Sequence, residues 1–335
     1  MRIGTWNVLS LYQAGALKKL LSQLDSYKTD ITALQELRWT GEGIIEKKNH
    51  TIFYSCDRKR HMFGTGFIVN KRIKHLVIDF KAKTPRICRI RVRGLFFNYI
   101  LICVHASTEE KDDEKDNFYE DLDQTYEECP KRDVKIILGD LNAEIGQEEI
   151  YRPIIGKYSL HTLSNDNGIR LIYFACSKNM VVASTLYNHK DIHKTTWRSP
   201  DGQTHNQTDH LLIDARHVSN VMDVRTFRGA NIDSDHYLLI SKIRSRISNA
   251  RKTCGSCARK FNIEKLKTPE TSSAYKKQLN EHLAKHATND NDNINDMWML
   301  LKNTIRQTAD TVLDRTERVI HIDWIGLTQN VSRQR

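Results

Sequence analysis

The sequence has no long apolar run and no segment typical of a secretory signal. Its longest apolar run, residues 95–104, is interrupted by Asn98 and is about half as long as a membrane-spanning helix requires. The chain opens with Met-Arg-Ile-Gly-Thr-Trp, without the apolar stretch of a signal peptide. These absences argue against a membrane protein, and we expect a soluble intracellular protein with no membrane partner.

Paired cysteines and nucleotide-binding glycines are scarce as well. The seven cysteines are odd in number and scattered, which suits a reducing compartment better than a disulfide framework. Cys254 and Cys257 form one CxxC motif with no second pair, so we expect no zinc site there. The strand expected at residues 63–69 contains glycines but no Gly-x-Gly-x-x-Gly pattern, and the chain has no internal repeats.

Positive charge is abundant. The 335 residues carry a formal net charge of +11, and the pI is about 9.2. A basic surface favours a polyanionic partner, either nucleic acid or an anionic membrane face, although charge alone can also serve solubility. The length suits one large domain with an appendage, and a hydrophobic content of 39% is enough for a sizeable core.

Short apolar segments with polar residues at their edges recur along the first part of the chain. Residues 134–142 read as a buried strand, a glycine turn, and then Asp140 and Asn142. Alone, this pair fits a turn or a helix N-cap as well as a site. Polar residues of the same kinds stand at the edges of other expected strands: Asn7, Glu36, His105, Asp209, Asp235 and His236.

The recurrence of these residues indicates a common cleft. Each of them alone fits an ordinary loop or structural residue, but a full set of carboxylates, amides and histidines at strand ends does not. Strand ends of α/β sheets are where ligands usually bind. Oxygen ligands of this kind suit Mg²⁺ best. On a basic chain, such a cleft points to phosphodiester hydrolysis.

The character of the chain changes at about residue 245. A basic segment is followed by a helix that starts at Thr268-Pro269 and by an amphipathic helix over residues 294–312. We expect residues 1–245 to form the chemically active domain. Residues 246–335 would then be a basic linker and a helical extension for docking or dimerisation.

Four motifs carry a family resemblance: Trp6-Asn7, Gln35-Glu36, Gly139-Asp-Leu-Asn142 and Ser234-Asp-His236. In this order they resemble the endonuclease/exonuclease/phosphatase superfamily (DNase-I-like, exonuclease-III-like), over roughly residues 2–244. Further segments, among them Ile102-Cys-Val-His105, resemble the endonuclease domain of RTE-type non-LTR retrotransposons and the related craniofacial development protein 2-like proteins. In the retroelements a reverse transcriptase follows. This chain stops at Arg335, so we expect no polymerase activity.

The resemblance implies both a fold and a cofactor. The fold would be α/β, a four-layer sandwich of two packed mixed β-sheets flanked by helices, with a helical C-terminal extension. Glu36 would be the principal ligand of Mg²⁺, or of Mn²⁺ in its place, with Asn7 and Asp235 nearby. Some relatives carry an acid where Leu9 stands, so the metal would depend more on Glu36 here.

The resemblance also implies catalytic roles. Asp140 would orient and deprotonate the attacking water, and Asn142 would hold that water or the phosphate. His236 would contact the scissile phosphate, with Asp209 fixing its orientation and charge. His105 would protonate the leaving oxygen or steady the transition state.

We therefore predict a Mg²⁺-dependent DNA endonuclease that nicks one strand and leaves 3′-hydroxyl and 5′-phosphate ends. A nuclear location is expected only because the substrate is DNA, and the oligomeric state is left open. Two alternatives stay open. One is a lipid or inositol phosphatase of the same superfamily. The other is a catalytically idle protein that binds nucleic acid or another partner.

Overall fold

The computed structural model describes residues 1–108, 112–244, 261–284 and 294–313. The chain divides into two compact units, Met1–Asn249 and Ala250–Arg335. The CxxC motif at residues 254–257 and a polar linker expected at residues 289–293 lie outside the described residues.

The first unit contains a seven-stranded sheet whose centre is a parallel pair, β1 and β2. All the other neighbours in this sheet are antiparallel. The strand order is β14 (Val221–Phe227), β15 (Leu238–Ile243), β1 (Arg2–Asn7), β2 (Ile31–Gln35), β5 (Thr65–Asn70), β4 (His50–Ser55) and β3 (Glu42–Glu46). Helix α1 (Ala16–Tyr27) packs on this sheet, because Leu20 and Leu24 are buried in one cluster with Trp6 and Leu34.

The second sheet has six strands and is built around another parallel pair, β8 and β9. Its order is β10 (Met180–Val182), β13 (Asp209–Asp214), β9 (Val134–Asp140), β8 (Tyr99–His105), β7 (Ile87–Val92) and β6 (Val77–Thr84). Helices α3 (Asp112–Glu127) and α4 (Asp166–Ser177) cover its outer face and bury Leu122, Leu171 and Ile172 against it.

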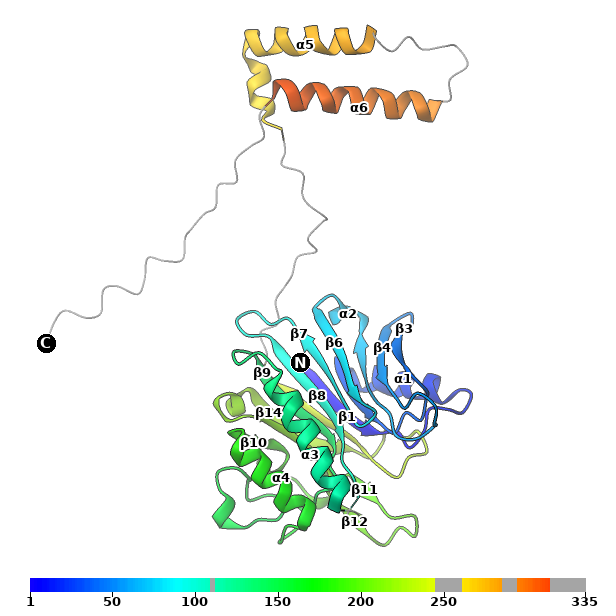
Figure 1. Ribbon diagram of the computed structural model, residues 1–335, viewed down its shortest axis with the longest axis vertical. Coiled ribbons are helices and arrows are strands. Elements are labelled where there is room, and N and C mark those ends of the chain that lie inside the picture. The colour runs from blue at the N-terminus through cyan, green and yellow to red at the C-terminus, as the bar shows by residue number, and fades with distance from the viewer. Residues whose placement is uncertain (109–111, 245–260, 285–293, 314–335) are drawn as a thin grey trace, which may run out of the picture. The chain divides into compact units, whose positions relative to one another are not determined.

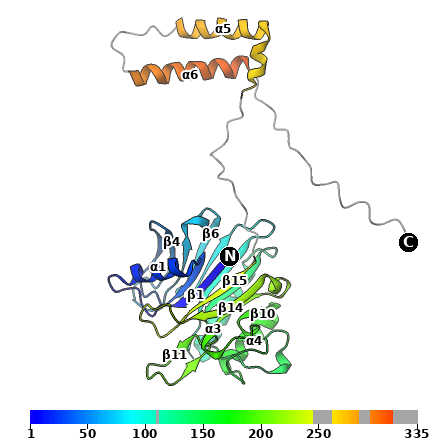
Figure 2. The same cartoon turned by 180° about the vertical axis from the view of Figure 1, so that it is seen from behind.

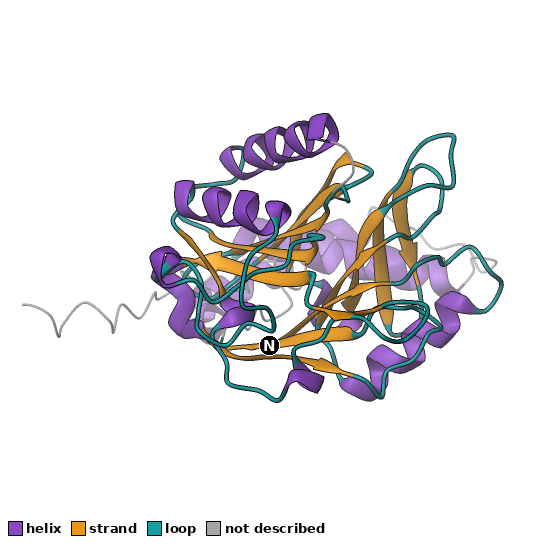
Figure 3. Ribbon diagram, turned by 90° about the horizontal axis from the view of Figure 1, so that it is seen from below, coloured by secondary structure: helices purple, strands orange, loops and turns teal. Residues whose placement is uncertain are grey.

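The two sheets pack against each other, and the helices lie outside them (Figures 1 and 2). Figure 3 shows the strands of this unit as two inner layers. Side chains tie the layers together: Gln35 donates to the sulfur of Cys103 over 3.1 Å, and Cys103 donates to the carbonyl of Leu34 over 3.2 Å. This arrangement confirms the expected four-layer α/β sandwich of two mixed sheets.

Strand register places the expected polar residues at one end of the sandwich. Asp140 lies beside His105 on the parallel strand β8 and beside Asp209 on the antiparallel strand β13. Gly139 allows this close approach, because its φ is 152° and a Cβ there would meet the carbonyl of Val104. Three residues far apart in the sequence thereby become neighbours across adjacent strands.

Some of the expected elements were wrong in detail. The tight turn expected at residues 199–202 predicted a hairpin whose second strand starts with Asp209, but the second strand does not start there. Instead β11 (Trp197–Arg198) pairs with β12 (His205–Asn206), and β13 joins the second sheet. Strands β3, β4 and β14 were not expected. β3 and β14 are edge strands with mixed polar and apolar residues, and the inner strand β4 has polar residues at both of its ends, His50, Thr51 and Ser55. The strand expected over residues 96–104 corresponds to β8, which begins at Tyr99, and Phe96 is exposed.

The remaining short elements are helical. They are α2 (Lys71–Lys74) and the 3₁₀ turns at Glu149–Tyr151, Ala183–Thr185, Asp191–His193, Ala215–Asn220 and Ile263–Lys267.

The second unit has helices α5 (Pro269–Ala284) and α6 (Ile294–Val312), which confirms a helical C-terminal region. Thr308 of α6 faces His282 of α5, with 3.4 Å between Oγ1 and Nδ1. Within the described residues, none of the helices has the length and apolar character that crossing a membrane would take.

Candidate active site

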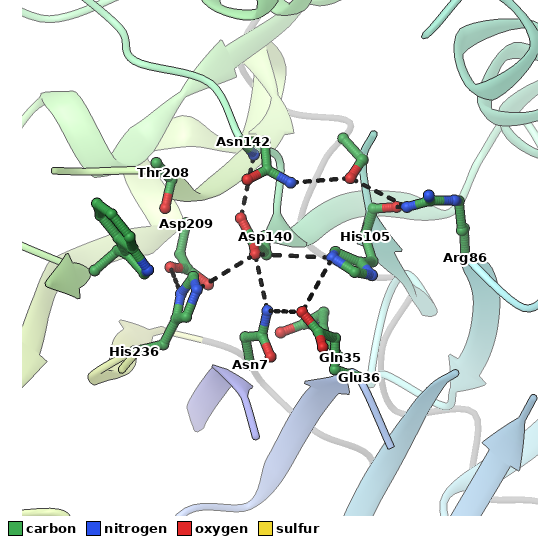
Figure 4. A network of polar contacts seen from close by, with 12 residues as sticks. Asn7, Gln35, Glu36, Arg86, His105, Asp140, Asn142, Thr208, Asp209 and His236 are labelled. Carbon is green, nitrogen blue, oxygen red and sulfur yellow. Dashed lines mark hydrogen bonds and ion pairs between the residues drawn. The ribbon is translucent and has the colours of Figure 1, made fainter. Parts of the chain in front are cut away.

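Asp140 is the centre of the polar cluster (Figure 4). It ends strand β9, and its side chain is buried. One carboxylate oxygen, Oδ2, accepts a hydrogen bond of 2.9 Å from Nδ2 of Asn7, and the other, Oδ1, accepts one of 3.1 Å from the backbone N–H of Asn142. Burial raises the pKa of the Asp140 carboxyl above its usual range.

Asn7 and Glu36 form one side of the cluster. Nδ2 of Asn7 donates to Oε1 of Glu36 over 3.1 Å as well as to Asp140, so two carboxylates converge on one amide. The second oxygen of Glu36 is paired with Arg38 at 2.6 Å. Burial raises the pKa of Glu36, but His105, Asn7 and Arg38 outweigh that effect, so the carboxyl titrates below its usual range.

His236 and Asp209 form the opposite side. Nδ1 of His236 lies 2.9 Å from Oδ2 of Asp209, and Nε2 lies 3.6 Å from Oδ2 of Asp140. Burial lowers the pKa of His236, but the two carboxylates outweigh burial and raise it to about 9. The ring is therefore an imidazolium at neutral pH, held between Asp140 and Asp209.

The chain segment that carries His236 is tied to the end of β1. The hydroxyl of Ser234 donates to the carbonyl of Asn7 over 2.7 Å, and the indole of Trp6 donates to the carbonyl of His236 over 2.9 Å. These two bonds bring residues 6–7 and 234–236 together. The first and last strands of the sandwich therefore share one corner of the site.

His105 closes the cluster from strand β8. Its Nε2 faces Oε1 of Glu36 at 3.7 Å and Oδ2 of Asp140 at 4.0 Å. Its Nδ1 is buried and has no hydrogen-bond partner among the described residues. Burial lowers the pKa of His105, so this ring is neutral where His236 is charged.

Asn142 reaches the site from the turn after β9, with a φ of 47°. Its Nδ2 donates to the carbonyl of Ala106 over 2.9 Å, and its own carbonyl accepts from Asn167 over the same distance. Arg86 donates to that same Ala106 carbonyl over 3.3 Å and stacks on Phe63. The loops after β8 and β9 are thus locked together beneath the cluster.

Asp235 does not join the others. Its Oδ2 accepts from the indole N–H of Trp197 over 2.9 Å, and among the described residues no hydrogen bond or ion pair links it to Asn7 or Glu36. The structure therefore brings together seven of the eight residues predicted from the sequence, and Asp235 lies beside them.

A cavity of about 240 Å³ opens next to the cluster. Asn142, Thr208 and His236 line one side of it. The remaining lining residues were not predicted: Thr108, Glu144, Asn165, Trp197 and Asn206. Arg38 and Arg86 were missed as well. Two of these residues could have been found from the sequence: Glu144 and Asn206 lie in segments 139–146 and 206–210, which resemble the retroelement endonucleases. Asn206 donates to Glu144 over 2.6 Å.

Two groups of side chains offer ligand atoms to a cation. Asp140, Asp209 and His236 each place one such atom within 4.8 Å of the others. The His236 imidazolium already fills the space between these carboxylates, so this group suits a proton better than a metal. Glu36 and Asp140 converge on Nδ2 of Asn7 instead, and their carboxylate oxygens fit a hard divalent cation, whereas Oδ1 of Asn7 accepts from the N–H of Leu9 over 3.0 Å.

The fold and this cluster define a class of protein. Residues 4–236 match the endonuclease/exonuclease/phosphatase family, and the chain belongs to that family. It is 37% identical over 252 residues to craniofacial development protein 2 of Tragulus javanicus, covering 75% of this chain and 43% of that protein. The Bos taurus protein of the same name is 36% identical, over 75% and 42%. The chain thus spans less than half the length of these curated relatives.

Solved structures show the same fold at low sequence identity. The catalytic domain of Xenopus laevis APE2 has a TM-score of 0.58 at 17% identity, covering 75% of this chain and 94% of its own. The endonuclease domain of TRAS1, a telomere-specific non-LTR retrotransposon, has 0.51 at 15%, over 73% and 98%. An AP endonuclease from Archaeoglobus fulgidus has 0.53 at 16%, over 72% and 99%.

Proposed function

We propose that this protein is a Mg²⁺-dependent endonuclease that hydrolyses one strand of DNA to 3′-hydroxyl and 5′-phosphate ends. The observation that carries the proposal is the shared position of Asp140. One of its oxygens lies between the Asn7–Glu36 side and the His236–Asp209 side, at 2.9 Å from Asn7 and 3.6 Å from His236. A carboxylate in this position can lie beside a bound cation, accept a proton from a water molecule and pair with a protonated histidine in one reaction.

Glu36 would hold the metal through its carboxylate, with Asp140 beside it, and Asn7 would ligate it through Oδ1, which accepts from the N–H of Leu9 in this structure. Mg²⁺, or Mn²⁺ in its place, would neutralise the charge that develops on phosphate oxygens. We keep Glu36 as the principal ligand, since Asn7 contacts it directly and Arg38 fixes its second oxygen. Asp235, which contacts Trp197, is the weakest of the predicted ligands.

The remaining residues would act on the water and the phosphate. Asp140 would accept the proton of the attacking water, and the buried site favours this because it raises the pKa of that carboxyl. The His236 imidazolium would offset the charge of the pentavalent phosphate, and Asp209 would keep it protonated. Asn142 would hold the water or the phosphate, and His105 would assist the leaving oxygen.

DNA is the favoured substrate for two reasons. The net charge of +11 suits a polyanion. The solved structures of similar fold include an AP endonuclease and a retrotransposon endonuclease domain, as their names state. A nuclear location follows if the substrate is DNA.

The test is nicking of supercoiled plasmid in Mg²⁺ and in EDTA by wild type, Asp140→Ala and Glu149→Gln. Glu149 is a matched acidic control, since its side chain is 86% exposed and pairs with Arg152, which is not part of the cluster. We expect Mg²⁺-dependent nicking by wild type and by Glu149→Gln, and a loss of at least about 100-fold in Asp140→Ala.

Two results would count against the proposal in different ways. Wild type that binds DNA but never nicks it would support the idle, DNA-binding alternative. Asp140→Ala that nicks as fast as wild type would leave the activity but remove Asp140 from its centre.

A further inference from the structure

Asp235 and Trp197 are joined in a way that the proposed chemistry does not use. The Trp197 indole N–H donates to Oδ2 of Asp235 over 2.9 Å. The other carboxylate oxygen, Oδ1, is buried and has no hydrogen-bond partner among the described residues. Burying a carboxylate oxygen without a hydrogen-bond partner costs free energy. The bond from Trp197 is therefore the one that compensates the buried Asp235 carboxylate among the described side chains.

The backbone on both sides of Trp197 is already fixed. Arg198 donates its N–H to the carbonyl of Asp235 over 3.0 Å, and Tyr237 donates to the carbonyl of Thr196 over 2.7 Å. The Thr196 hydroxyl in turn accepts from the backbone of Thr208 and Asp209, over 2.9 and 3.0 Å. With its backbone held, Trp197 keeps freedom only in its side-chain torsions. The bond to Asp235 removes that freedom.

The pair stands between two hollows. Trp197 lines the cavity of about 240 Å³ beside the catalytic cluster, and Asp235 lines a second hollow of about 340 Å³ that also holds Arg198 and Arg228. His236 lines both hollows. The Trp197 side chain therefore lines the first cavity, and Asp235, which lines the second, holds the indole through its hydrogen bond.

We propose that Asp235 is a positioning residue. It fixes the Trp197 ring as the wall against which the sugar and base next to the scissile phosphate pack. This inference rests on the proposed function, since it takes DNA as the ligand. The rest of the cavity suits a nucleoside rather than a further phosphate, because Glu144 lines it together with the amides of Asn165 and Asn206.

The inference contradicts a metal-ligand role for Asp235, and the two roles predict different variants. Asn keeps an acceptor for the indole N–H but is a poorer ligand for Mg²⁺ than a carboxylate. Asp235→Asn should therefore keep the Trp197 wall, whereas Asp235→Ala should release it. Trp197→Phe keeps a ring but removes the N–H, so it should resemble Asp235→Ala.

The experiment measures binding and metal dependence separately on the full chain. Anisotropy of a fluorescein-labelled DNA duplex, in EDTA and again in Ca²⁺, reports affinity without requiring hydrolysis. Plasmid nicking over a range of Mg²⁺ concentrations reports the metal. Base–aromatic stacking is worth about 1–3 kcal/mol, so we expect Asp235→Ala and Trp197→Phe to bind at least about 5-fold more weakly. Asp235→Asn should stay within about 3-fold of wild type.

The double variant Asp235→Ala/Trp197→Phe should bind no more weakly than either single variant, because both remove one interaction. The Mg²⁺ concentration for half-maximal nicking should be the same in Asp235→Asn and wild type. Thermal melts check that each variant is folded, and Asp235→Asn serves the test if Asp235→Ala does not fold.

Three results would overturn the inference: an Asp235→Asn variant that needs about 10-fold more Mg²⁺ or more, an Asp235→Ala variant with wild-type affinity, or wild type that binds no DNA in either buffer. If wild type binds DNA without nicking it, the proposed hydrolysis fails. The binding series still decides the role of Asp235.

Discussion

His210 should make the stability of this fold depend on pH, through a ring that never contacts the substrate. It follows Asp209 on β13 and is completely buried. Nε2 lies 2.8 Å from the carbonyl of Ala143, and Nδ1 lies 2.8 Å from the hydroxyl of Ser184. A carbonyl only accepts, so Nε2 donates, and the neutral ring can accept from Ser184 at Nδ1. His210 thereby holds the loop that carries Asn142.

The sign of the effect follows from the two pKa values. Burial lowers the pKa of His210 from 6.5 to about 4 in the folded protein. Between these values the unfolded chain binds a proton that the folded protein does not, so stability falls as the pH falls. Lowering the pH from 7 to 5 should cost about 2 kcal/mol from this residue alone, and about 3 kcal/mol by pH 4.

The assay is urea unfolding at pH 7 and pH 5 of wild type, His210→Gln and His205→Gln. Gln can still donate to the carbonyl of Ala143. Replacing the imidazole ring should lower the free energy of unfolding by about 1–3 kcal/mol at pH 7. The gap between wild type and His210→Gln should then shrink by about 2 kcal/mol at pH 5, because Gln does not titrate. His205 is exposed, so His205→Gln should follow the wild-type pH dependence. An equal gap at both pH values would refute the reasoning.

Two further variants test other parts of the site. Asp209→Asn should lower the pKa of His236 from about 9, since Asp209 is the main group that raises it. NMR titration of the His236 ring measures this directly, and an unchanged midpoint would contradict the ion pair. Gly139→Ala should lower the free energy of unfolding by about 3 kcal/mol or more, because φ is 152° and the new Cβ meets the Val104 carbonyl. Urea unfolding measures that loss, and a variant as stable as wild type would show that β8 and β9 can separate freely.

Much of the fold and site could be predicted because the signals are local. A buried strand is a short apolar run, and the polar residue next to that run lies at a strand end in any topology. Asp140, His105 and Asp209 could therefore be assigned to strand ends before the pairing of their strands was known. That these three strand ends are neighbours depends on strand register, which sequence periodicity does not give. The family motifs indicated that the residues share one site.

The rest depends on contacts between distant residues. Asp235 directly precedes His236, yet its partner is Trp197, 38 residues away. Arg38 lies two residues from Glu36, but only its side-chain direction makes it an ion-pair partner. The expected second strand of the hairpin was misplaced for the same reason: the hairpin pairs β11 with β12, and the segment that starts at Asp209 pairs with β9 and β10 instead.

The balance of charge in the site supports a cation beside Glu36. Three carboxylates meet there, those of Glu36, Asp140 and Asp209. The His236 imidazolium offsets the charge of Asp209, at 2.9 Å, and Arg38 is bonded to Glu36 at 2.6 Å. His105 adds no charge while it is neutral, and Arg86 is directed to the carbonyls of the loop after β8. Asp140 accepts hydrogen bonds from the Asn7 amide and the Asn142 backbone N–H, and its contacts with the two histidines are longer, so no cationic group lies within hydrogen-bond distance of it among the described residues. The corner that it shares with Glu36 is therefore where a cation would offset the most charge.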